Sequence, residues 1–504
     1  MADRFQPVYP VAGNAGLLSM LDCLTNSGPL PADAEVFENA LACAPENPHG
    51  PLGTRFTRDK PIYVVRAPAR LDCMGGIADY SGSLVCEMTL DRAVLMGIQA
   101  RDDRKVVIHS AGVDALGLSP DITLALDDLA PGTDNVDYDT VKRDFSKTPE
   151  STWAAYVAGA FSVLNGEGYV DRFPHGATMV LVSNIPLRVG VSSSAALEIA
   201  AMHGLNLLYG TSLDGMTLAA LSQKVENHVV GAACGIMDQV TCAMGTRGRL
   251  LSLLCQPHTM QEQIPVPDGV RLIGINSGIR REIRGERYTN SRIGAFMGLA
   301  IIRDHLRSGN GTVADHGLGY LCNISTTEYV NSFRSQLPSS ISGRAFKRRY
   351  GDTPDPVTTV DPETMYKVRS RVEHPVYENR RTTDFTECIR LAGSSEQPGL
   401  FERAGSLMYA SDWSYTHRCG LGSTETTWFV REIRKLGVEA GFYGAKITGG
   451  GAGGTVAVAG NDRMFDHLDH LLERYGETTG IEAELFTGTS PGALEFGHRV
   501  YRMT

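Results

Sequence analysis

The sequence predicts a globular protein of mixed α and β class with more than one domain, and three observations support this prediction. Short runs of β-branched and aliphatic residues recur along the chain, and stretches with helical spacing of apolar residues lie between them. Hydrophobic residues make up 42% and charged residues 21% of the 504 residues, which gives ample material for a core. At about 150 residues per domain, the length predicts roughly three domains or two large ones.

The first 60 residues form a segment with a different character. Prolines interrupt it at positions 7, 10, 29, 31, 45, 48 and 51. A helix is expected over about 32–43, directly after Pro31. We therefore expect residues 1–60 to be an N-terminal extension that packs on the main body.

The rest of the chain has a more regular pattern. Buried strands are predicted over four segments: 62–65, 178–182, 272–276 and 455–459. Helices are predicted over three segments: 194–209, which ends before Gly210, 213–230 and 283–306. Prolines cluster at 257, 265 and 267, which predicts a boundary near 256–270. The polar, proline-studded segment of about 337–400 is expected to wrap the surface.

Charge and cysteine usage exclude several classes of protein. Lys and Arg total 47 against 57 Asp and Glu, a net charge of −10, which argues against nucleic acid or an anionic membrane as the main partner. The ten cysteines include no CxxC pair, so we expect reduced thiols and not a disulfide framework. The sequence has no signal-peptide pattern and no apolar run of membrane-spanning length. It predicts a soluble, cytoplasmic protein.

Three consecutive serines, Ser192–Ser194, lie between a predicted strand and an Ala-rich predicted helix. Small residues at a helix start leave several backbone N–H groups accessible, and the helix dipole adds partial positive charge. This arrangement favours a phosphate site. An ordinary N-cap serine with two neighbours explains the pattern equally well at this stage.

A second loop candidate is the glycine cluster Gly449–Gly454, which directly precedes the predicted strand 455–459. Such a loop can press its backbone against a ligand, or it can be a plain flexible turn.

The third candidate is a carboxylate pair, Glu226 and Asp238. Asp238 is flanked by apolar residues, and a buried Asp needs a partner. Arg70 is one of few cations in an apolar, Gly-rich neighbourhood, so we consider an Arg70–Asp238 pair. A surface Arg and a helix-capping Asp are the alternative interpretation.

Together, these motifs occur in the order and spacing of the GHMP small-molecule kinases, which the chain resembles over about residues 61–504. The segments Arg70–Tyr80 and Val191–Glu198 are similar to the sugar signature and the phosphate loop of the galactokinase branch, and Cys234–Gln239 is identical to its usual core. The resemblance implies an α+β fold of two lobes with the active site in the cleft between them. The N-terminal lobe, 61–260, would be like domain 2 of ribosomal protein S5. The C-terminal lobe, 261–504, would be ferredoxin-like, with a polar insertion around 337–400.

The resemblance also implies roles for single residues. Asp238 would be the catalytic Asp that faces the anomeric hydroxyl, and Arg70 would stabilise the transition state and hold Asp238 ionised. Sugar contacts are implied for Gly76, Asp79, Tyr80, Tyr288 and Asp238. ATP and Mg²⁺ are the implied cofactors, with Ser194 and Glu226 reaching the metal. The ATP-binding residues would be Arg188, Val189, Gly190, Val191, Ser192, Ser193, Ser194, Gly449, Gly450 and Gly451.

One departure from the galactokinase pattern concerns the sugar. Galactokinases usually have Glu-His-Thr-Asp where this chain has Gly76-Ile77-Ala78-Asp79. In galactokinases that Glu binds the hydroxyl on C6, and L-arabinopyranose lacks this hydroxymethyl group. Galactose would therefore bury an unpaired hydroxyl at about 1–3 kcal/mol, roughly a 5- to 150-fold bias towards L-arabinose. Several other segments resemble the kinase part of plant L-arabinokinases, including His374–Asn379 and Cys419–Ser423.

The expected function is therefore an ATP-dependent sugar 1-kinase, with L-arabinose as the first substrate candidate. The alternatives are a galactokinase or another sugar 1-kinase, for example for galacturonate, and a non-catalytic sensor of sugar and ATP. An isoprenoid-pathway kinase of the same superfamily fits less well, because it leaves the sugar signature around Asp79 unexplained. The sequence indicates neither the adenine-binding residues nor the oligomeric state.

Overall fold

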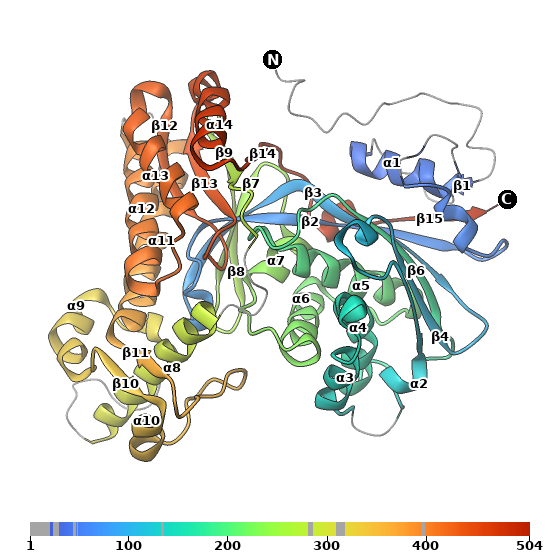
Figure 1. Ribbon diagram of the computed structural model, residues 1–504, viewed down its shortest axis with the longest axis horizontal. Coiled ribbons are helices and arrows are strands. Elements are labelled where there is room, and N and C mark those ends of the chain that lie inside the picture. The colour runs from blue at the N-terminus through green and yellow to red at the C-terminus, as the bar shows by residue number, and fades with distance from the viewer. Residues whose placement is uncertain are drawn as a thin grey trace.

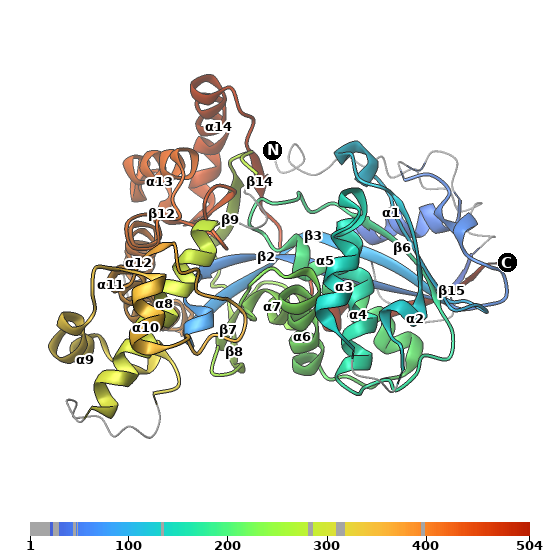
Figure 2. The same cartoon turned by 60° about the horizontal axis from the view of Figure 1, so that its bottom comes forward.

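The computed structural model describes residues 21–23, 30–43, 47, 49–132, 136–280, 286–308, 318–394 and 399–503. Strands and helices mix along the chain and form two parts that lie side by side (Figures 1 and 2). One part is built on a nine-stranded sheet and the other on a four-stranded sheet. The predicted mixed α and β class is confirmed.

The nine-stranded sheet has the order β1-β15-β2-β3-β6-β4-β5, and β7 and β8 continue from the other end of β3. Its pairs are antiparallel except β4 with β6. Its strands are β1 (Leu21–Cys23), β2 (Ile62–Met74), β3 (Leu84–Ala100), β4 (Lys105–Ser110), β5 (Asp121–Ala125), β6 (Ala177–Ser183), β7 (Arg249–Leu254), β8 (Thr259–Pro265) and β15 (His498–Met503).

Different helices cover the two faces of this sheet. Successive side chains of a strand point to opposite faces, so neighbouring residues contact different helices. Val65 and Met179 face the main core beneath α4, α5, α6 and α7, whereas Val64 and Val180 pack with α1. The expected packing of the N-terminal segment on the main body is present in its described residues. The helices of this part are α1 (Ala32–Leu41), α2 (Leu126–Leu129), α3 (Tyr138–Phe145), α4 (Ala155–Gly166), α5 (Ser193–Tyr209), α6 (Gly215–Lys224), α7 (Met237–Met244) and α15 (Ala493–Phe496).

The four-stranded sheet is antiparallel with the order β12-β13-β9-β14. Its strands are β9 (Arg271–Asn276), β12 (Phe442–Ile447), β13 (Thr455–Gly460) and β14 (Glu484–Phe486). Helices intervene between β9 and β12, and α14 (Phe465–Thr479) lies between β13 and β14. This is the βαββαβ pattern of a ferredoxin-like sheet, as expected for the second part. The helices α13 (Thr424–Leu436) and α14 cover the face that carries Ile273 and Val456.

The segment 337–400 was expected to wrap the surface. Residues 338–365 are mostly exposed or half-buried, but the expectation was wrong for residues 369–394. The segment contains a 26-residue helix, α11 (Arg369–Ser394), which runs beside α12 (Leu400–Ser414) (Figure 1). Phe385 of α11 is fully buried in the main core. Polar residues of this helix are buried as well, because distant segments supply their partners. The neighbouring elements are α8 (Glu286–Arg307), α9 (Thr326–Glu328), β10 (Ser340–Ser342), α10 (Gly343–Tyr350) and β11 (Met365–Lys367).

The predicted elements are present, with shifted ends. Strand β2 continues nine residues beyond the predicted Val65, to Met74. The helix predicted over 213–230 is α6 followed by a π-helical turn, Val225–Val230. The start of the helix predicted from Ile283 lies outside the described residues, and α8 accounts for the rest.

The end of the chain returns to the first part, where β15 pairs with β2. The predicted division at residue 260 therefore does not describe residues 498–503, which belong in space to the nine-stranded sheet. Among the described residues, no helix combines the length and apolar character needed to span a membrane.

Candidate active site

Three loops meet where the two sheets adjoin: residues 75–83 after β2, the phosphate loop 188–194 before α5, and the glycine loop 448–454 between β12 and β13. Seven described non-glycine residues have a positive φ, and four of them lie in these loops: Ile77, Arg188, Ser192 and Ala452. Such conformations cost about 1–3 kcal/mol each and cluster at functional sites. The backbone alone therefore marks this region as a candidate site.

The predicted pair of Arg70 and Asp238 is confirmed at the centre of these loops. Arg70 Nε and Nη2 donate to Asp238 Oδ1 at 3.0 and 2.7 Å. Arg70 lies on β2 and is buried, whereas the side chain of Asp238, in the first turn of α7, keeps 22% exposure. Burial disfavours a charged guanidinium, but the charges of Asp238, Glu87 and Asp72 outweigh this and raise the pKa of Arg70.

The phosphate loop is held against this pair. Arg70 Nη1 donates to the carbonyl of Gly190 at 2.8 Å, and the backbone N–H of Arg70 donates to Val191 O at 3.1 Å. The hydroxyl of Ser192 donates to Asp238 Oδ2 at 2.6 Å instead of capping α5. Both carboxylate oxygens of Asp238 are thus engaged, and the carboxylate has a fixed orientation.

The remaining phosphate-loop residues differ in exposure. Arg188 is exposed, and the buried Val189 accepts a hydrogen bond from Thr455 Oγ1 at 2.9 Å through its carbonyl. Ser193 and Ser194 are the half-buried first residues of α5. The N–H groups of this first turn have no intrahelical acceptor, which suits an anion.

The glycine loop packs directly on the phosphate loop. A Cβ added to Gly449 would lie 2.6 Å from Gly190 O and 3.1 Å from Arg70 Nη2, so the two backbones approach as only glycine allows. Gly450 is half-buried and Gly451, with a φ of 68°, abuts Leu421. The alternative interpretation of a plain flexible turn does not account for this packing.

Asp79 lies close to the catalytic candidate pair. Its carboxylate occupies the space beside Gly235, where a Cβ would come within 1.6 Å of Asp79 Oδ2. Burial, and then the charge of Asp238, raise the pKa of Asp79 to about 6. Gly235 is therefore required for Asp79 to stand beside the Asp238 segment.

Tyr80, which directly follows Asp79, belongs to an aromatic cluster. The ring of Tyr80 packs edge-on against Tyr288 with centroids 6.1 Å apart, and the guanidinium of Arg292 lies 5.3 Å from the Tyr80 ring centroid. Arg292 is buried, forms a bidentate pair with Asp355 and donates to Cys234 O at 3.0 Å. The predicted sugar-contact residues Asp79, Tyr80 and Tyr288 are thus brought together.

Gly76 has no space for a side chain. A Cβ there would lie 1.9 Å from the Tyr415 hydroxyl and 2.1 Å from Asp72 Oδ2. Its carbonyl accepts a hydrogen bond from His374 Nε2 at 3.0 Å.

Glu226 lies in a buried acidic group beside α5. Gln239 Nε2 donates to Glu226 Oε2 at 2.8 Å and to Glu198 Oε2 at 2.9 Å. Burial, together with the charge of Glu226, raises the pKa of Glu198 well above its ordinary value. Glu198 is one helical turn beyond Ser194, so the two side chains lie on the same face of α5. Glu226, which shares the amide of Gln239 with Glu198, lies beside this face. Among the described residues, no group of three or more acidic, His or Cys side chains could hold a metal ion.

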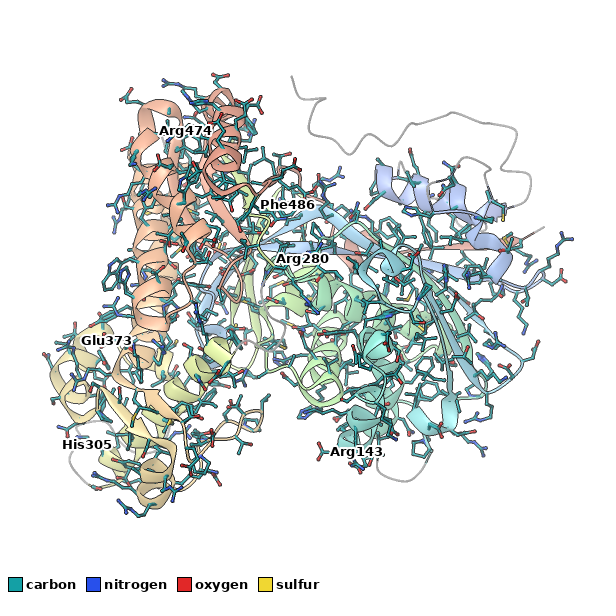
Figure 3. All side chains as sticks on the ribbon, viewed as in Figure 1. Arg143, Arg280, His305, Glu373, Arg474 and Phe486 are labelled. Carbon is teal, nitrogen blue, oxygen red and sulfur yellow. The ribbon has the colours of Figure 1, made fainter. Side chains whose placement is uncertain are left out.

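Several residues of this region were not singled out from sequence. Glu87 on β3 is fully buried, and its Oε2 lies 3.2 Å from Arg70 Nε. Burial and the charge of Asp72 raise its pKa well above the ordinary value. The sequence could have indicated Glu87 only through its pairing opposite Asp72, which requires the register of β2 and β3. Arg280, an exposed cation after β9, lies where the two parts meet (Figure 3).

Comparisons with known proteins agree with this geometry. Residues 155–246, which hold the phosphate loop, Glu226 and Asp238, match the GHMP kinases N terminal domain. The chain is 36% identical to the L-arabinokinase of Arabidopsis thaliana over 95% of its own length and 50% of that relative. This chain contains a GHMP kinase N-terminal domain.

The matches to other relatives cover a larger share of those proteins. The galactokinase of Chloroflexus aggregans is 28% identical over 84% of this chain and 91% of that protein. A crystal structure of Lactococcus lactis galactokinase complexed with galactose superposes with a TM-score of 0.66 and 22% identity, covering 87% of this chain and 94% of that one. The chain spans half the length of the plant relative, and it shares its fold with the bacterial galactokinase.

Proposed function

We propose that this chain is a GHMP kinase, an ATP-dependent sugar 1-kinase that phosphorylates the anomeric hydroxyl of a galactose-like monosaccharide, with L-arabinose as its substrate. The observation that carries the proposal is the Arg70–Asp238 pair, fixed by Ser192 where three strained loops meet. The similarity to L-arabinokinase and galactokinase supports the same reaction class. ADP and L-arabinose 1-phosphate would be the products.

The proposed reaction is a direct phosphoryl transfer. The anomeric oxygen forms a bond to the γ-phosphorus as the bond to the β–γ bridging oxygen breaks, and ADP leaves with that electron pair. Asp238 orients the hydroxyl and accepts its proton late, since an Asp held by Arg70 is a weak base. Arg70 stabilises the charge that develops on the transferred group.

We assign the phosphates of ATP to residues 188–194 and to Gly449–Gly451. The accessible N–H groups at the start of α5 and the close approach of the two loops favour a polyphosphate here. Ser194 and Glu226 would hold Mg²⁺, which would neutralise phosphate charge. Asp79, Tyr80 and Tyr288 would contact the sugar, and Gly76 would line its site.

The choice of L-arabinose rests on Gly76. Residue 76 is a glycine, and Tyr415 and Asp72 occupy the space beside its Cα. No side chain at this position can therefore bind a hydroxyl on C6. A sugar without an exocyclic carbon loses nothing from this absence, whereas a hexose would bury an unpaired group. We also propose a cytoplasmic location, because nine of the cysteines, from Cys43 to Cys419, are free thiols.

The test is ADP release from Mg·ATP with L-arabinose, D-galactose, D-galacturonate, D-glucuronate and mevalonate. We expect L-arabinose to have the highest kcat/KM, about 5- to 150-fold above galactose. Asp238→Asn should lower kcat by about 10²- to 10⁴-fold. Asp214→Asn is the matched control, because Asp214 caps α6 at an exposed position and Asn caps helices equally well.

Each other outcome has a definite meaning. If galactose has the highest kcat/KM, the kinase assignment stands and the arabinose assignment is wrong. If Asp238→Asn keeps wild-type activity, the catalytic assignment is wrong. If no sugar releases ADP but one raises the melting temperature, the chain is a sensor.

A further inference from the structure

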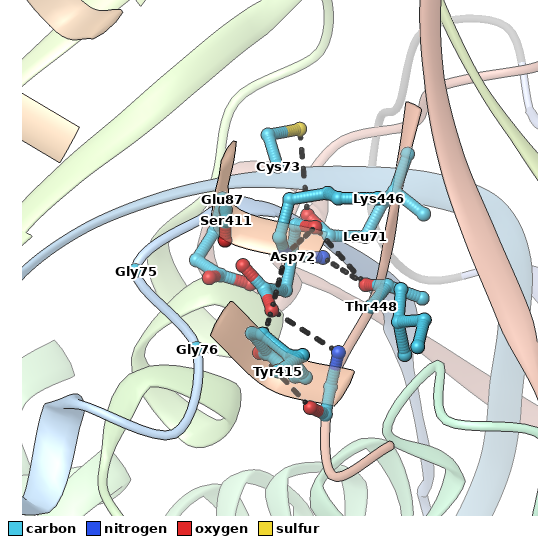
Figure 4. A network of polar contacts seen from close by, with 12 residues as sticks. Leu71, Asp72, Cys73, Gly75, Gly76, Glu87, Ser411, Tyr415, Lys446 and Thr448 are labelled. Atoms are coloured by element: carbon cyan, nitrogen blue, oxygen red, sulfur yellow. Dashed lines mark hydrogen bonds and ion pairs between the residues drawn. The ribbon is translucent and has the colours of Figure 1, made fainter. Parts of the chain in front are cut away.

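A buried ionic cluster lies next to the site, and the proposed phosphoryl transfer does not use it. Its centre is Asp72 on β2, two residues beyond Arg70, with Lys446, Thr448 and Tyr415 around it (Figure 4). All four side chains are fully buried. Burying a charged pair costs free energy of solvation, so the cluster by itself adds little net stability.

One oxygen of Asp72 receives almost all of the contacts. Asp72 Oδ2 accepts from Tyr415 OH at 2.9 Å, Lys446 Nζ at 3.0 Å and the backbone N–H of Gly449 at 3.1 Å. Asp72 Oδ1 has no hydrogen-bond partner among the described residues. All three hydrogen bonds to the Asp72 carboxylate therefore end on one oxygen.

The backbone of Asp72 is held by the same segment. Its N–H donates to Thr448 Oγ1 at 2.8 Å, and Thr448 Oγ1 lies 3.1 Å from Asp72 O. Thr448 and Gly449 are the first residues of the glycine loop, which follows directly on β12. Asp72 thus fixes the start of this loop to β2, beside Arg70.

The same oxygen also borders the loop that carries Asp79. A Cβ at Gly76 would meet Asp72 Oδ2 and the Tyr415 hydroxyl, and that hydroxyl also lies 3.2 Å from Gly449 O. Residues 75–76 receive further bonds from α11, through His374 to Gly76 O and from Gly75 N–H to Glu378. Asp72 and Tyr415 therefore contact both the Asp79 loop and the glycine loop (Figure 4).

We propose that Asp72 is a positioning residue that couples the two loops, so that Gly449 stands against Arg70 and the phosphate loop only while Asp72 Oδ2 accepts its hydrogen bonds. Because Gly449 is packed against Gly190 O and Arg70 Nη2, a shift of the glycine loop would displace the groups assigned to ATP. The expected effect of Asp72 on turnover rests on the proposed kinase function. The attachment of the glycine loop to Asp72 does not depend on that function.

The test separates charge from hydrogen bonding. Asp72→Leu/Lys446→Met removes the acceptor and leaves no unpaired charge, whereas Asp72→Asn/Lys446→Met keeps an amide acceptor without the charge. The matched control is Asp33→Leu/Arg66→Met, which removes the ion pair between Arg66 of the same strand and Asp33 of α1, where the Nη2–Oδ2 distance is 2.9 Å. The readouts are amide hydrogen exchange of residues 448–454, melting temperature, and kcat and KM for sugar and ATP.

We expect the Leu/Met variant to fold, to exchange these amides about tenfold faster and to lose about tenfold in kcat/KM for ATP, as for one or two lost hydrogen bonds. The Asn/Met variant should recover most of both losses, and the control should change neither. Equal behaviour of the two Asp72 variants, or a Leu/Met variant with wild-type exchange and kinetics, would overturn the proposal.

Two further outcomes remain decisive. If the Asp72 variants do not fold, Tyr415→Phe removes one bond to the same oxygen without changing charge, and unchanged exchange and kinetics in that variant would reject the role. If the wild-type chain phosphorylates no sugar, the proposed function fails, and the exchange measurement still tests the coupling of the loops.

Discussion

Asp79, which we propose contacts the sugar, is a buried carboxylate with a raised pKa. Its pKa of about 6 results first from burial and then from the charge of Asp238. If the ionised carboxylate accepts hydrogen bonds from the sugar, KM for the sugar should rise as the pH falls below about 6, by about tenfold per pH unit. Asp79→Asn should give a high KM that does not depend on pH between 5 and 8, and an unchanged wild-type profile in that variant would contradict the assignment.

The stability of the same variant has a defined pH dependence. Because the folded-state pKa of Asp79 is above its ordinary value of 3.8, its contribution to stability is complete below about pH 3.8 and is lost as the pH rises through about 6. The melting temperature of Asp79→Asn relative to wild type should therefore increase from pH 4 to pH 8. Asp214→Asn, at an exposed helix cap, is the control for general effects of the substitution.

At the scale of single residues, chemistry was easier to predict than contacts. Arg70 and Asp238 could be paired because a buried Asp needs a cation. Ser192 was expected to bind ATP as part of its loop, and the hydrogen bond of its hydroxyl to Asp238 was not predicted. Asp72 and Lys446 are 374 positions apart, and no local pattern in the sequence connects them.

Helix α12 packs closely on strand β12 at Gly405, and this contact gives a prediction at the scale of elements. A Cβ on Gly405 of α12 would lie 2.0 Å from Tyr443 O, whereas a Cβ on Gly393 of α11 would be 3.8 Å from its nearest neighbour, Pro267. Gly405→Ala should destabilise the protein by about 1–3 kcal/mol or more, since the backbones must separate. Gly393→Ala should be neutral or stabilise by up to about 1 kcal/mol through helix propensity. Urea denaturation of both variants checks this, and equal midpoints would refute the close packing.

The same scale shows why residues 369–394 were misjudged. Helix α11 has polar residues on its buried side, and their partners lie far away in the sequence: His374 binds Gly76 O, and Glu378 accepts from Ser411 Oγ at 2.5 Å. A polar composition predicts a surface only when such partners are lacking. The long-range pairing decided the outcome.

For the whole molecule, the sequence predicted the α and β class and the order of the site motifs, but not how the chain closes. The ferredoxin-like second sheet followed from the family resemblance and is present as βαββαβ. The return of residues 498–503 to β2 had no signal in periodicity, because a short strand beside a distant partner resembles any other alternating segment.

This closure can be tested at Tyr501, which pairs opposite Ile62 of β2 and Cys23 of β1. Tyr501 is 2% exposed, whereas its neighbour Arg502 is exposed on the other face. Tyr501→Ala should cost about 3–5 kcal/mol, as for other buried aromatic residues, and Arg502→Ala should stay within about 0.5 kcal/mol of wild type. The Tyr501 hydroxyl has no partner among the described residues, so Tyr501→Phe should be neutral or slightly stabilising. Urea midpoints of the three variants decide the point, because equal losses for Tyr501→Ala and Arg502→Ala would mean that β15 does not close the first part.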